Sequence, residues 1–235
     1  MDLLARLAED PSRAALFLDI DGVLAPIVPR PEDARVPEET QAELRRLATR
    51  YALVACISGR AGADAERVVG VPDVVYVGNH GLERSSEAPA WATRLRAFLQ
   101  GVDWPVLEDK GLTAALHYRG IADEPSALVR LEQIAAAARS EGFRTRFGRK
   151  VLEILPPIAA NKGTAVRALL AERGLDRALY AGDDTTDLDG FRALDGLELA
   201  VRVAVASAEG PQELRVEADI VLASTAEALA MLTQL

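Results

Sequence analysis

Short apolar runs alternate along this chain with longer segments whose apolar residues recur at helical spacing. Each run is almost continuous in apolar residues, as expected of a parallel strand that is buried on both faces. The runs lie at residues 16–20, 52–57, 74–77, 178–181, 198–203 and 219–222. Strands that alternate with helices predict the fold class α/β, with a doubly wound parallel Rossmann-like sheet.

Helix boundary signals support this alternation. Pro37 stands where a first helical residue is expected, ahead of an apolar stripe. A second stripe lies within Lys162–Arg173, and the glycine behind it predicts the end of that helix. A last helix should begin at Ser224, where Glu227 completes a capping box.

Residues 83–156 break the alternation. They hold a helical pattern near 90–104, a strand at 113–119, a second helix at 124–141, and two strands at 143–147 and 150–155. This order of elements predicts a small α+β unit inserted into the α/β domain. We therefore expect a core domain of residues 1–82 and 157–235, and an inserted domain of residues 83–156.

The charge balance argues against nucleic acid as a partner. The chain has 235 residues, is 49% hydrophobic and carries a net charge of −9, with no stretch that gathers its lysines and arginines. We see neither a signal peptide nor an apolar run long enough to span a membrane. The single cysteine, Cys56, lies in an apolar run and should be a buried, inert thiol. We expect a cytoplasmic monomer that acts on a small molecule.

Two aspartates end the first apolar run. Asp19 and Asp21 are followed by Gly22, which allows the chain to bend sharply. Side chains alternate along a strand, so both carboxylates would point the same way if the strand continued. Carboxylates held this close need a cation or a proton between them. The pattern predicts metal-assisted chemistry in which one aspartate is free to act as a nucleophile.

Three further polar segments are expected at the same edge of the sheet. Ser58 follows the second run, Lys162 begins a helix, and Asp183 follows the fourth run. Ligands of open α/β sheets bind beyond the carboxyl ends of the strands. These segments should therefore meet Asp19 and Asp21 at that edge.

This set of side chains suits phosphoryl transfer. A carboxylate that attacks phosphorus divides one difficult displacement into two easier ones, and Mg²⁺ would offset the charge repulsion. Asp19, Asp183 and the backbone carbonyl of Asp21 are the candidate metal ligands. Asp19 would be the nucleophile, and the Asp21 side chain would serve as acid and then as base. Ser58 and Lys162 would hold the phosphoryl oxygens.

Each segment also has a purely structural interpretation. An Asp-x-Asp pair can form a turn or a cap, and Asp183 with Asp184 can cap the next helix. Ser58 can be an ordinary loop hydroxyl, and Lys162 can be a solvated lysine. The combination, with every member at a strand end or a helix start, favours a catalytic site.

Asp19, Asp21, Ser58, Lys162 and Asp183 resemble, position by position, the catalytic residues of the haloacid dehalogenase-like superfamily of phosphatases. The resemblance implies a Mg²⁺-dependent reaction in which Asp19 attacks phosphorus and Asp21 transfers the proton. It also implies that two more carboxylates lie behind the metal ligands and contact them, namely Asp184 and Asp187.

Longer motifs resemble the trehalose-6-phosphate phosphatase family over most of the chain. They lie at residues 21–28, 78–83, 116–119, 148–154 and 182–187. The resemblance implies hydrolysis of trehalose 6-phosphate, with the inserted domain as an α+β cap that closes over the sugar. The substrate-binding residues that it implies are Arg60, His80, Gly81, Glu83, His117, Arg119, Arg149, Lys150 and Glu153.

Other interpretations remain open at this point. A related phosphatase could act on another sugar phosphate, and a receiver domain or an inactive regulatory phosphatase would also gather aspartates on an α/β sheet. The inserted domain and the second aspartate, Asp21, argue against a receiver domain. His117 could be a structural histidine in a half-buried strand, and Arg149 and Lys150 could form the solvated rim of a hairpin.

Overall fold

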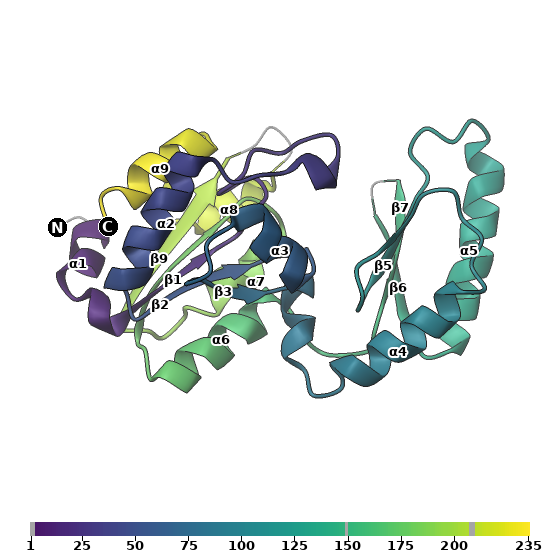
Figure 1. Ribbon diagram of the computed structural model, residues 1–235, viewed down its shortest axis with the longest axis horizontal. Helices are drawn as coiled ribbons and strands as arrows, with labels where there is room; N and C mark the ends of the chain where they lie inside the picture. The colour runs from purple at the N-terminus through teal and green to yellow at the C-terminus, as the bar shows by residue number, and fades with distance from the viewer. Residues whose placement is uncertain (1–2, 149, 207–209) are drawn as a thin grey trace. The chain divides into compact units, whose positions relative to one another are not determined.

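The computed structural model describes residues 3–148, 150–206 and 210–235 (Figure 1). The chain forms a larger unit, Met1–Gly81 with Ala160–Leu235, and an inserted unit, Leu82–Ala159. The chain therefore passes between units after residues 81 and 159, compared with 82 and 156 expected from the sequence. Arg149, one of the predicted substrate-binding residues, lies outside the described residues.

The larger unit is built on a six-stranded sheet in the order β10-β9-β8-β1-β2-β3. Every neighbouring pair of these strands is parallel, which confirms the predicted doubly wound α/β fold class. The strands are β1 (Ala14–Leu18), β2 (Leu53–Ile57), β3 (Val75–Val77), β8 (Arg177–Gly182), β9 (Leu199–Val205) and β10 (Ile220–Leu222).

Helices cover both faces of this sheet (Figure 1). Side chains alternate along β1, so Leu16 and Leu18 enter one hydrophobic core while Ala15 and Phe17 enter the other. The first core includes residues of α1 (Leu3–Glu9), α2 (Glu38–Arg50), α3 (Gly62–Val69) and α9 (Thr225–Leu232). The second includes residues of α6 (Lys162–Arg173), α7 (Asp187–Arg192) and α8 (Gln212–Glu217).

The inserted unit has its own antiparallel sheet and its own core. The sheet order is β4-β5-β7-β6, formed by β4 (Leu107–Asp109), β5 (Ala114–His117), β6 (Arg144–Gly148) and β7 (Val151–Leu155). Leu116, Leu152 and Ile154 pack from this sheet against α4 (Ala88–Leu99) and α5 (Glu124–Ser140). The α+β character predicted for the insertion is confirmed. Within the described residues, none of the helices is both long and apolar enough to cross a membrane.

Several element boundaries differ from the predicted ones. Pro37 is the residue before α2 and not its first residue, and the helix expected near 90–104 ends at Leu99. Ser224 caps α9 as predicted, but the Glu227 carboxylate accepts its bond from the Ala223 N–H. The short elements α1, α3, α7, α8 and β4 were not predicted, since their apolar patterns span too few residues.

Strand order places a topological switch point at β1. β2 and β3 extend the sheet from one side of β1, whereas β8, β9 and β10 extend it from the other. Ligands of open α/β sheets bind at such a switch point, outside the carboxyl ends of the strands. The residues that follow β1, β2 and β8 are therefore the ones to inspect.

Candidate functional site

Asp19 follows β1 directly and is fixed through both its backbone and its carboxylate. Its N–H donates to the carbonyl of Ala181 in β8, at 2.9 Å, which extends the pairing of the two strands. Its Oδ1 accepts from the N–H of Ile20 at 2.8 Å, and its Oδ2 accepts from Lys162 Nζ at 2.7 Å. The side chain is buried, so each of these bonds acts with little competition from water.

Lys162 is a buried cation at the first position of α6. The Asn161 side chain caps this helix in a reciprocal capping box with Thr164, which fixes where the helix begins. Lys162 Nζ donates to Asp19 Oδ2 and to Asp187 Oδ1, each at 2.7 Å, and the side chain is 2% exposed. A buried ammonium is stable only with partners of this kind. The ordinary solvated lysine that the sequence allowed is therefore excluded.

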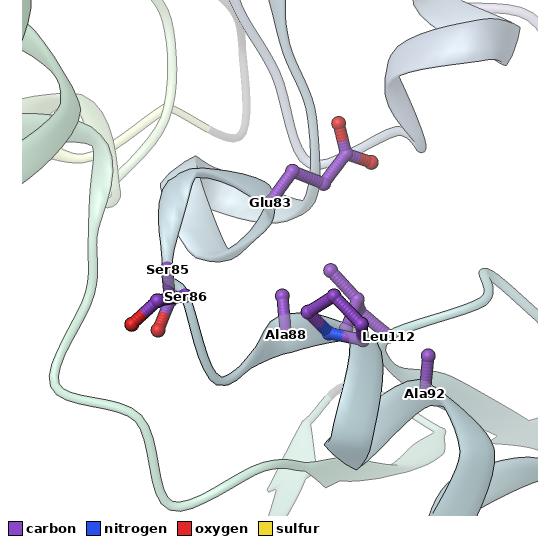
Figure 2. A pocket seen from close by; sticks show the side chains of 7 residues that line it. Glu83, Ser85, Ser86, Ala88, Ala92 and Leu112 are labelled. Atoms are coloured by element: carbon purple, nitrogen blue, oxygen red, sulfur yellow. The ribbon is translucent and has the colours of Figure 1, made fainter.

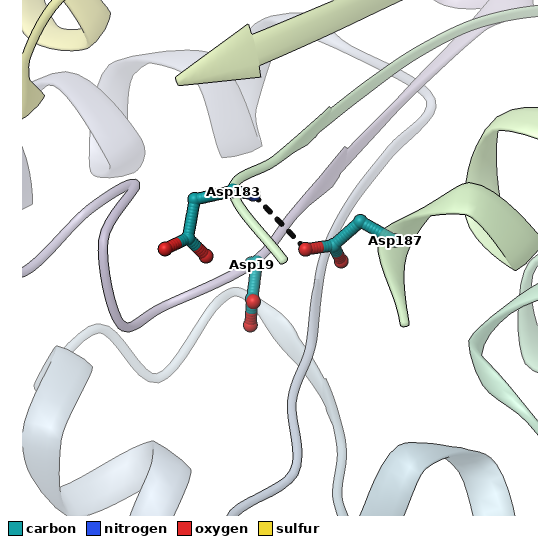
Figure 3. Close-up of side chains that lie close together, drawn as sticks. All are labelled: Asp19, Asp183 and Asp187. Carbon is teal, nitrogen blue, oxygen red and sulfur yellow. Dashed lines mark hydrogen bonds between the residues drawn. The ribbon is translucent and has the colours of Figure 1, made fainter. Parts of the chain in front are cut away.

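Asp187 accepts four hydrogen bonds from other residues of the site. Its Oδ2 accepts from the backbone N–H groups of Asp183 and Asp184, both at 3.0 Å, and the first of these bonds is drawn in Figure 3. Its Oδ1 accepts from Lys162 Nζ and from the hydroxyl of Tyr180, both at 2.7 Å. These four bonds hold the loop after β8 in place. Asp187 thus orients Asp183 and Lys162, while the Asp184 residue is exposed.

The carboxylates exceed the cations in this buried cluster. The Lys162 ammonium contacts Asp19 and Asp187, and Asp183 lies close to both, so three carboxyl groups share one cation. Burial raises the pKa of Asp19 to about 7; Lys162 opposes this and Asp187 adds to it. Burial, Asp19 and Asp187 raise the pKa of Asp183 to about 8. Burial would lower the pKa of Lys162, but both carboxylates raise it.

The donor set fits a hard divalent cation. One carboxylate oxygen from each of Asp19, Asp183 and Asp187 lies within 4.8 Å of the other two, and Figure 3 shows the three side chains side by side. Mg²⁺ takes one or two carboxylates and keeps several waters. Asp187 already accepts four hydrogen bonds, so Asp19 and Asp183 keep more free lone pairs for a cation. Gly22 has a φ of +82°, and a Cβ there would lie 2.2 Å from Asp183 Oδ2, so the chain passes close to that carboxylate.

Asp21 lies beyond the end of β1, and its carboxylate pairs with Arg60. β1 ends at Leu18, so strand alternation does not extend to residue 21. The Asp21 carboxylate is 39% exposed and accepts two hydrogen bonds from Arg60, at 2.7 and 2.8 Å. The predicted residues Ser58 and Arg60 lie two positions apart, and Ser58 Oγ accepts from the Arg60 N–H at 3.2 Å.

Residues 79–81 form an unusual turn beside this loop. Asn79 and His80 both have positive φ, at 50° and 54°, although neither is glycine, and Gly81 follows at 97°. Such backbone persists where surrounding contacts enforce it, often at functional sites. A Cβ on Gly59 would lie 2.7 Å from the His80 ring, and one on Gly81 would lie 2.8 Å from the Asn161 carbonyl. The structure thus places His80 against the Ser58–Arg60 loop.

The predicted sugar-binding residues of the inserted unit fall into separate groups. Register places His117 and Glu153 on the same face of the second sheet. His117 Nε2 lies 3.2 Å from a Glu108 oxygen, and Glu153 accepts from Arg146 at 2.6 Å. Polar side chains therefore gather on the face opposite the core of this unit.

The remaining predictions in this unit lie elsewhere. Lys150 pairs with Glu124 and lies over the Tyr118 ring, while Arg119 is exposed. Glu83 lines a shallow pocket of about 300 Å³ together with mostly small residues (Figure 2). Its other lining residues are Ser85, Ser86, Ala88, Pro89, Ala92 and Leu112.

Two contributing residues were not predicted. Tyr180 lies in the apolar run at residues 178–181, and its hydroxyl donates to Asp187. A tyrosine in a fully buried strand needs a hydrogen-bond partner for its hydroxyl, so the sequence could have predicted a polar partner for Tyr180. Asp64 accepts from Arg60 at 2.7 Å, and its spacing of four residues from Arg60 on the way into α3 could have suggested the pair.

The chain was compared with known protein families, with individual proteins and with solved structures. A sequence profile of the trehalose-phosphatase family matches residues 17–225. A trehalose-phosphate phosphatase of Mycobacterium marinum (strain ATCC BAA-535 / M) is 34% identical over 217 residues, which cover 81% of this chain and 54% of the relative. An uncharacterized glycosyl hydrolase of Mycobacterium tuberculosis (strain CDC 1551 / Oshkosh) is 36% identical over 219 residues, covering 81% of this chain but 16% of the relative. The chain thus spans only part of these relatives.

Solved structures share the fold along nearly the whole chain. A trehalose-6-phosphate phosphatase related protein superposes with a TM-score of 0.70 at 25% identity, covering 93% of this chain and 95% of that one. A haloacid dehalogenase-like hydrolase from Bacteroides thetaiotaomicron superposes with a TM-score of 0.61 at 13% identity, covering 93% and 98%. The second likeness bears on the fold alone.

Proposed function

We propose that this chain, which belongs to the trehalose-phosphatase family, hydrolyses trehalose 6-phosphate to trehalose and inorganic phosphate. The observation that carries the proposal is the buried contact of Lys162 with both Asp19 and Asp187, beside Asp183, at the carboxyl ends of β1 and β8. A buried cation and a nucleophilic carboxylate at one strand edge suit the transfer of an anionic group.

We further propose that Mg²⁺ is the divalent metal. Asp19, Asp183 and the Asp21 carbonyl would hold it, with Asp187 and Asp184 behind them. When bound, the cation would neutralise charge between Asp19 and the phosphate oxygens. The oxygen-only donors and the raised pKa values of Asp19 and Asp183 support a hard cation.

The chain's own residues would then divide the reaction into two steps. Asp19 attacks phosphorus, an Asp19–phosphorus bond forms, and the bond from phosphorus to the sugar oxygen breaks. Asp21 gives its proton to that oxygen, and trehalose leaves as an alcohol. Asp21 next takes a proton from water, whose oxygen attacks phosphorus and releases phosphate from Asp19. Ser58 and Lys162 hold the phosphoryl oxygens throughout.

Recognition of the sugar would come from polar side chains. A site that selects a disaccharide must pair its hydroxyls with donors and acceptors. The shared face of His117 and Glu153 supports such a role for the inserted unit as a cap. We propose the same role for His80, Gly81, Glu83, Arg119, Arg149 and Lys150. We also propose that the chain acts as a monomer, which light scattering on the eluting protein would test.

Phosphate release tests the proposed function directly. The purified chain is assayed against trehalose 6-phosphate and a panel of other sugar phosphates, first with EDTA and then with Mg²⁺ restored. We expect no turnover with EDTA, recovery with Mg²⁺, and the highest kcat/KM for trehalose 6-phosphate. A higher kcat/KM for another sugar phosphate would contradict the substrate, and activity that survives EDTA would contradict the metal.

A further inference from the structure

Arg60 forms a bidentate ion pair with the Asp21 carboxylate through two parallel hydrogen bonds. Arg60 Nε donates to Asp21 Oδ2 at 2.7 Å, and Nη2 donates to Oδ1 at 2.8 Å. A guanidinium that meets a carboxylate in this way fixes the carboxylate's plane as well as its position. Each carboxylate oxygen has two lone pairs, so Asp21 can still exchange a proton at a site that Arg60 does not occupy.

The other side of the guanidinium is held by the protein itself. Arg60 Nη1 donates to Asp64 Oδ2 at 2.7 Å and to the Pro31 carbonyl at 3.1 Å. Asp64 is braced in turn by Arg67, which donates to its Oδ1 at 2.6 and 2.9 Å. Together with the two bonds to Asp21, these contacts engage four of the five N–H groups of a guanidinium. At most one N–H group of the Arg60 guanidinium therefore remains for a ligand.

Burial and backbone contacts fix Arg60 further. Its side chain is 11% exposed, whereas the Asp21 side chain is 39% exposed. The Arg60 N–H donates to Ser58 Oγ, and its carbonyl accepts from the Asn79 N–H at 2.7 Å. The rigid partner is thus the arginine, and the accessible partner is the carboxylate that would meet substrate.

We infer that Arg60 is a positioning residue that aims the Asp21 carboxylate at the leaving-group oxygen, rather than a residue that binds phosphate. The inference rests on the proposed function, because it takes Asp21 as the proton-transfer group. It replaces the sequence-based prediction that Arg60 contacts the substrate. It also gives a task to the Asp64–Arg67 pair, which holds Arg60 from behind.

A comparison of two leaving groups tests this. An alkyl phosphate such as trehalose 6-phosphate needs a proton on its leaving oxygen, whereas p-nitrophenyl phosphate has a leaving group that departs as an anion. The ratio kcat/KM covers the steps up to the aspartyl-phosphate, so it isolates that requirement. For Arg60→Ala we expect a loss of roughly 100-fold on the alkyl ester and below about fivefold on the aryl ester.

Two further variants sharpen the result. Asp21→Asn should show the same selective loss, and adding Arg60→Ala to it should lower kcat/KM by less than about twofold, since Arg60 acts through Asp21. Arg60→Lys keeps the charge but not the paired geometry, so it should show an intermediate, equally selective loss. It also serves if Arg60→Ala does not fold. Arg45→Ala, an exposed arginine on α2, is the matched control.

The possible results distinguish a failure of the inference from a failure of the proposed function. Equal losses on both esters would mean that Arg60 binds phosphate, and a full additional loss in the Asp21→Asn background would mean that it acts independently of Asp21. Either result overturns the inference while the wild-type activity leaves the proposed function intact. Wild-type protein that releases phosphate from neither ester would overturn the proposed function, and the inference with it.

Discussion

The residue that most changes the interpretation of this chain is Lys162. In the sequence it is one lysine among 27 lysines and arginines. In the structure it is buried between Asp19 and Asp187, at 2.7 Å from each. Removing one partner of a buried ion pair leaves an uncompensated charge, so the three side chains depend on one another for stability as well as for chemistry.

The nucleophile is the first residue to test. Asp19→Asn keeps the shape of the side chain but removes the charge that would attack phosphorus. We expect phosphate release to fall by several orders of magnitude. Steady-state assays with Mg²⁺ check this, with exposed Asp73→Asn as the control. Turnover within tenfold of wild type would exclude Asp19 as the nucleophile.

The Tyr180 hydroxyl should stabilise the site without touching substrate. Tyr180→Phe removes one of the four bonds that Asp187 accepts. Hydrogen bonds to a charged acceptor contribute about 1.5–3 kcal/mol, so we expect a loss of that order in the free energy of unfolding. Urea unfolding measures it. Tyr76→Phe, whose hydroxyl donates to the neutral carbonyl of Val71 at 2.6 Å, should lose clearly less.

Two helices carry the two partners of the buried Lys162–Asp187 ion pair. Lys162 begins α6, and Asp187 begins α7. Gly163, next to Lys162, faces α7 so closely that a Cβ would lie 2.2 Å from the Asp189 carbonyl oxygen. The close approach of these two helices is what brings the ammonium to the carboxylate.

Gly163→Ala tests this approach. Alanine favours a helix interior over glycine by about 1 kcal/mol, yet the added methyl meets backbone that cannot move away. We expect a net loss of about 1–3 kcal/mol in the free energy of unfolding and a lower kcat, because α7 must shift from Lys162. Chemical denaturation and phosphate release measure both. Arg167→Ala, exposed on the same helix, should change stability by less than about 0.5 kcal/mol. A Gly163→Ala variant as stable as wild type would contradict the packing argument.

Long periodic elements were predictable from sequence, and short ones were not. The helix Lys162–Arg173 and its glycine stop were predicted to the residue, because Asn161 and Gly174 signal both ends. β4 has three residues and α7 has six, too few to show a period. Asp19, Lys162, Asp183 and Asp187 do meet at the strand ends, as topology requires. The ion pair of Asp21 with Arg60 was not predictable, since the two residues lie 39 positions apart and meet only through the fold.

At the scale of the whole molecule, charge couples the site to stability. The pKa values of Asp19 and Asp183 are raised to about 7 and about 8 from 3.8. Between these limits the folded state binds more protons than the unfolded state, so the free energy of unfolding falls as pH rises. A cation that binds only the folded state should reverse this loss.

Thermal unfolding should reveal that coupling. In EDTA we expect the Tm to be lower at about pH 8 than at about pH 5, by roughly 5 °C or more. Mg²⁺ should raise the Tm at the higher pH, and Asp183→Asn should flatten the pH dependence. A metal-free Tm that is constant or rises over this range would show that burial and the neighbouring carboxylates do not destabilise the ionised forms of Asp19 and Asp183.

The division of the chain into a continuous and a discontinuous unit has a consequence for the order of folding during synthesis. Leu82–Ala159 is uninterrupted and has a core of its own, so all its contacts exist once it leaves the ribosome. The larger unit must wait, because its central strand β1 pairs with β8, which is made after the entire insertion. The N-terminal strands therefore remain incomplete while the inserted unit is already folded. Nascent chains arrested before β8 should yield a protease-resistant fragment that covers Leu82–Ala159, and a fragment that begins at β1 instead would reverse this order.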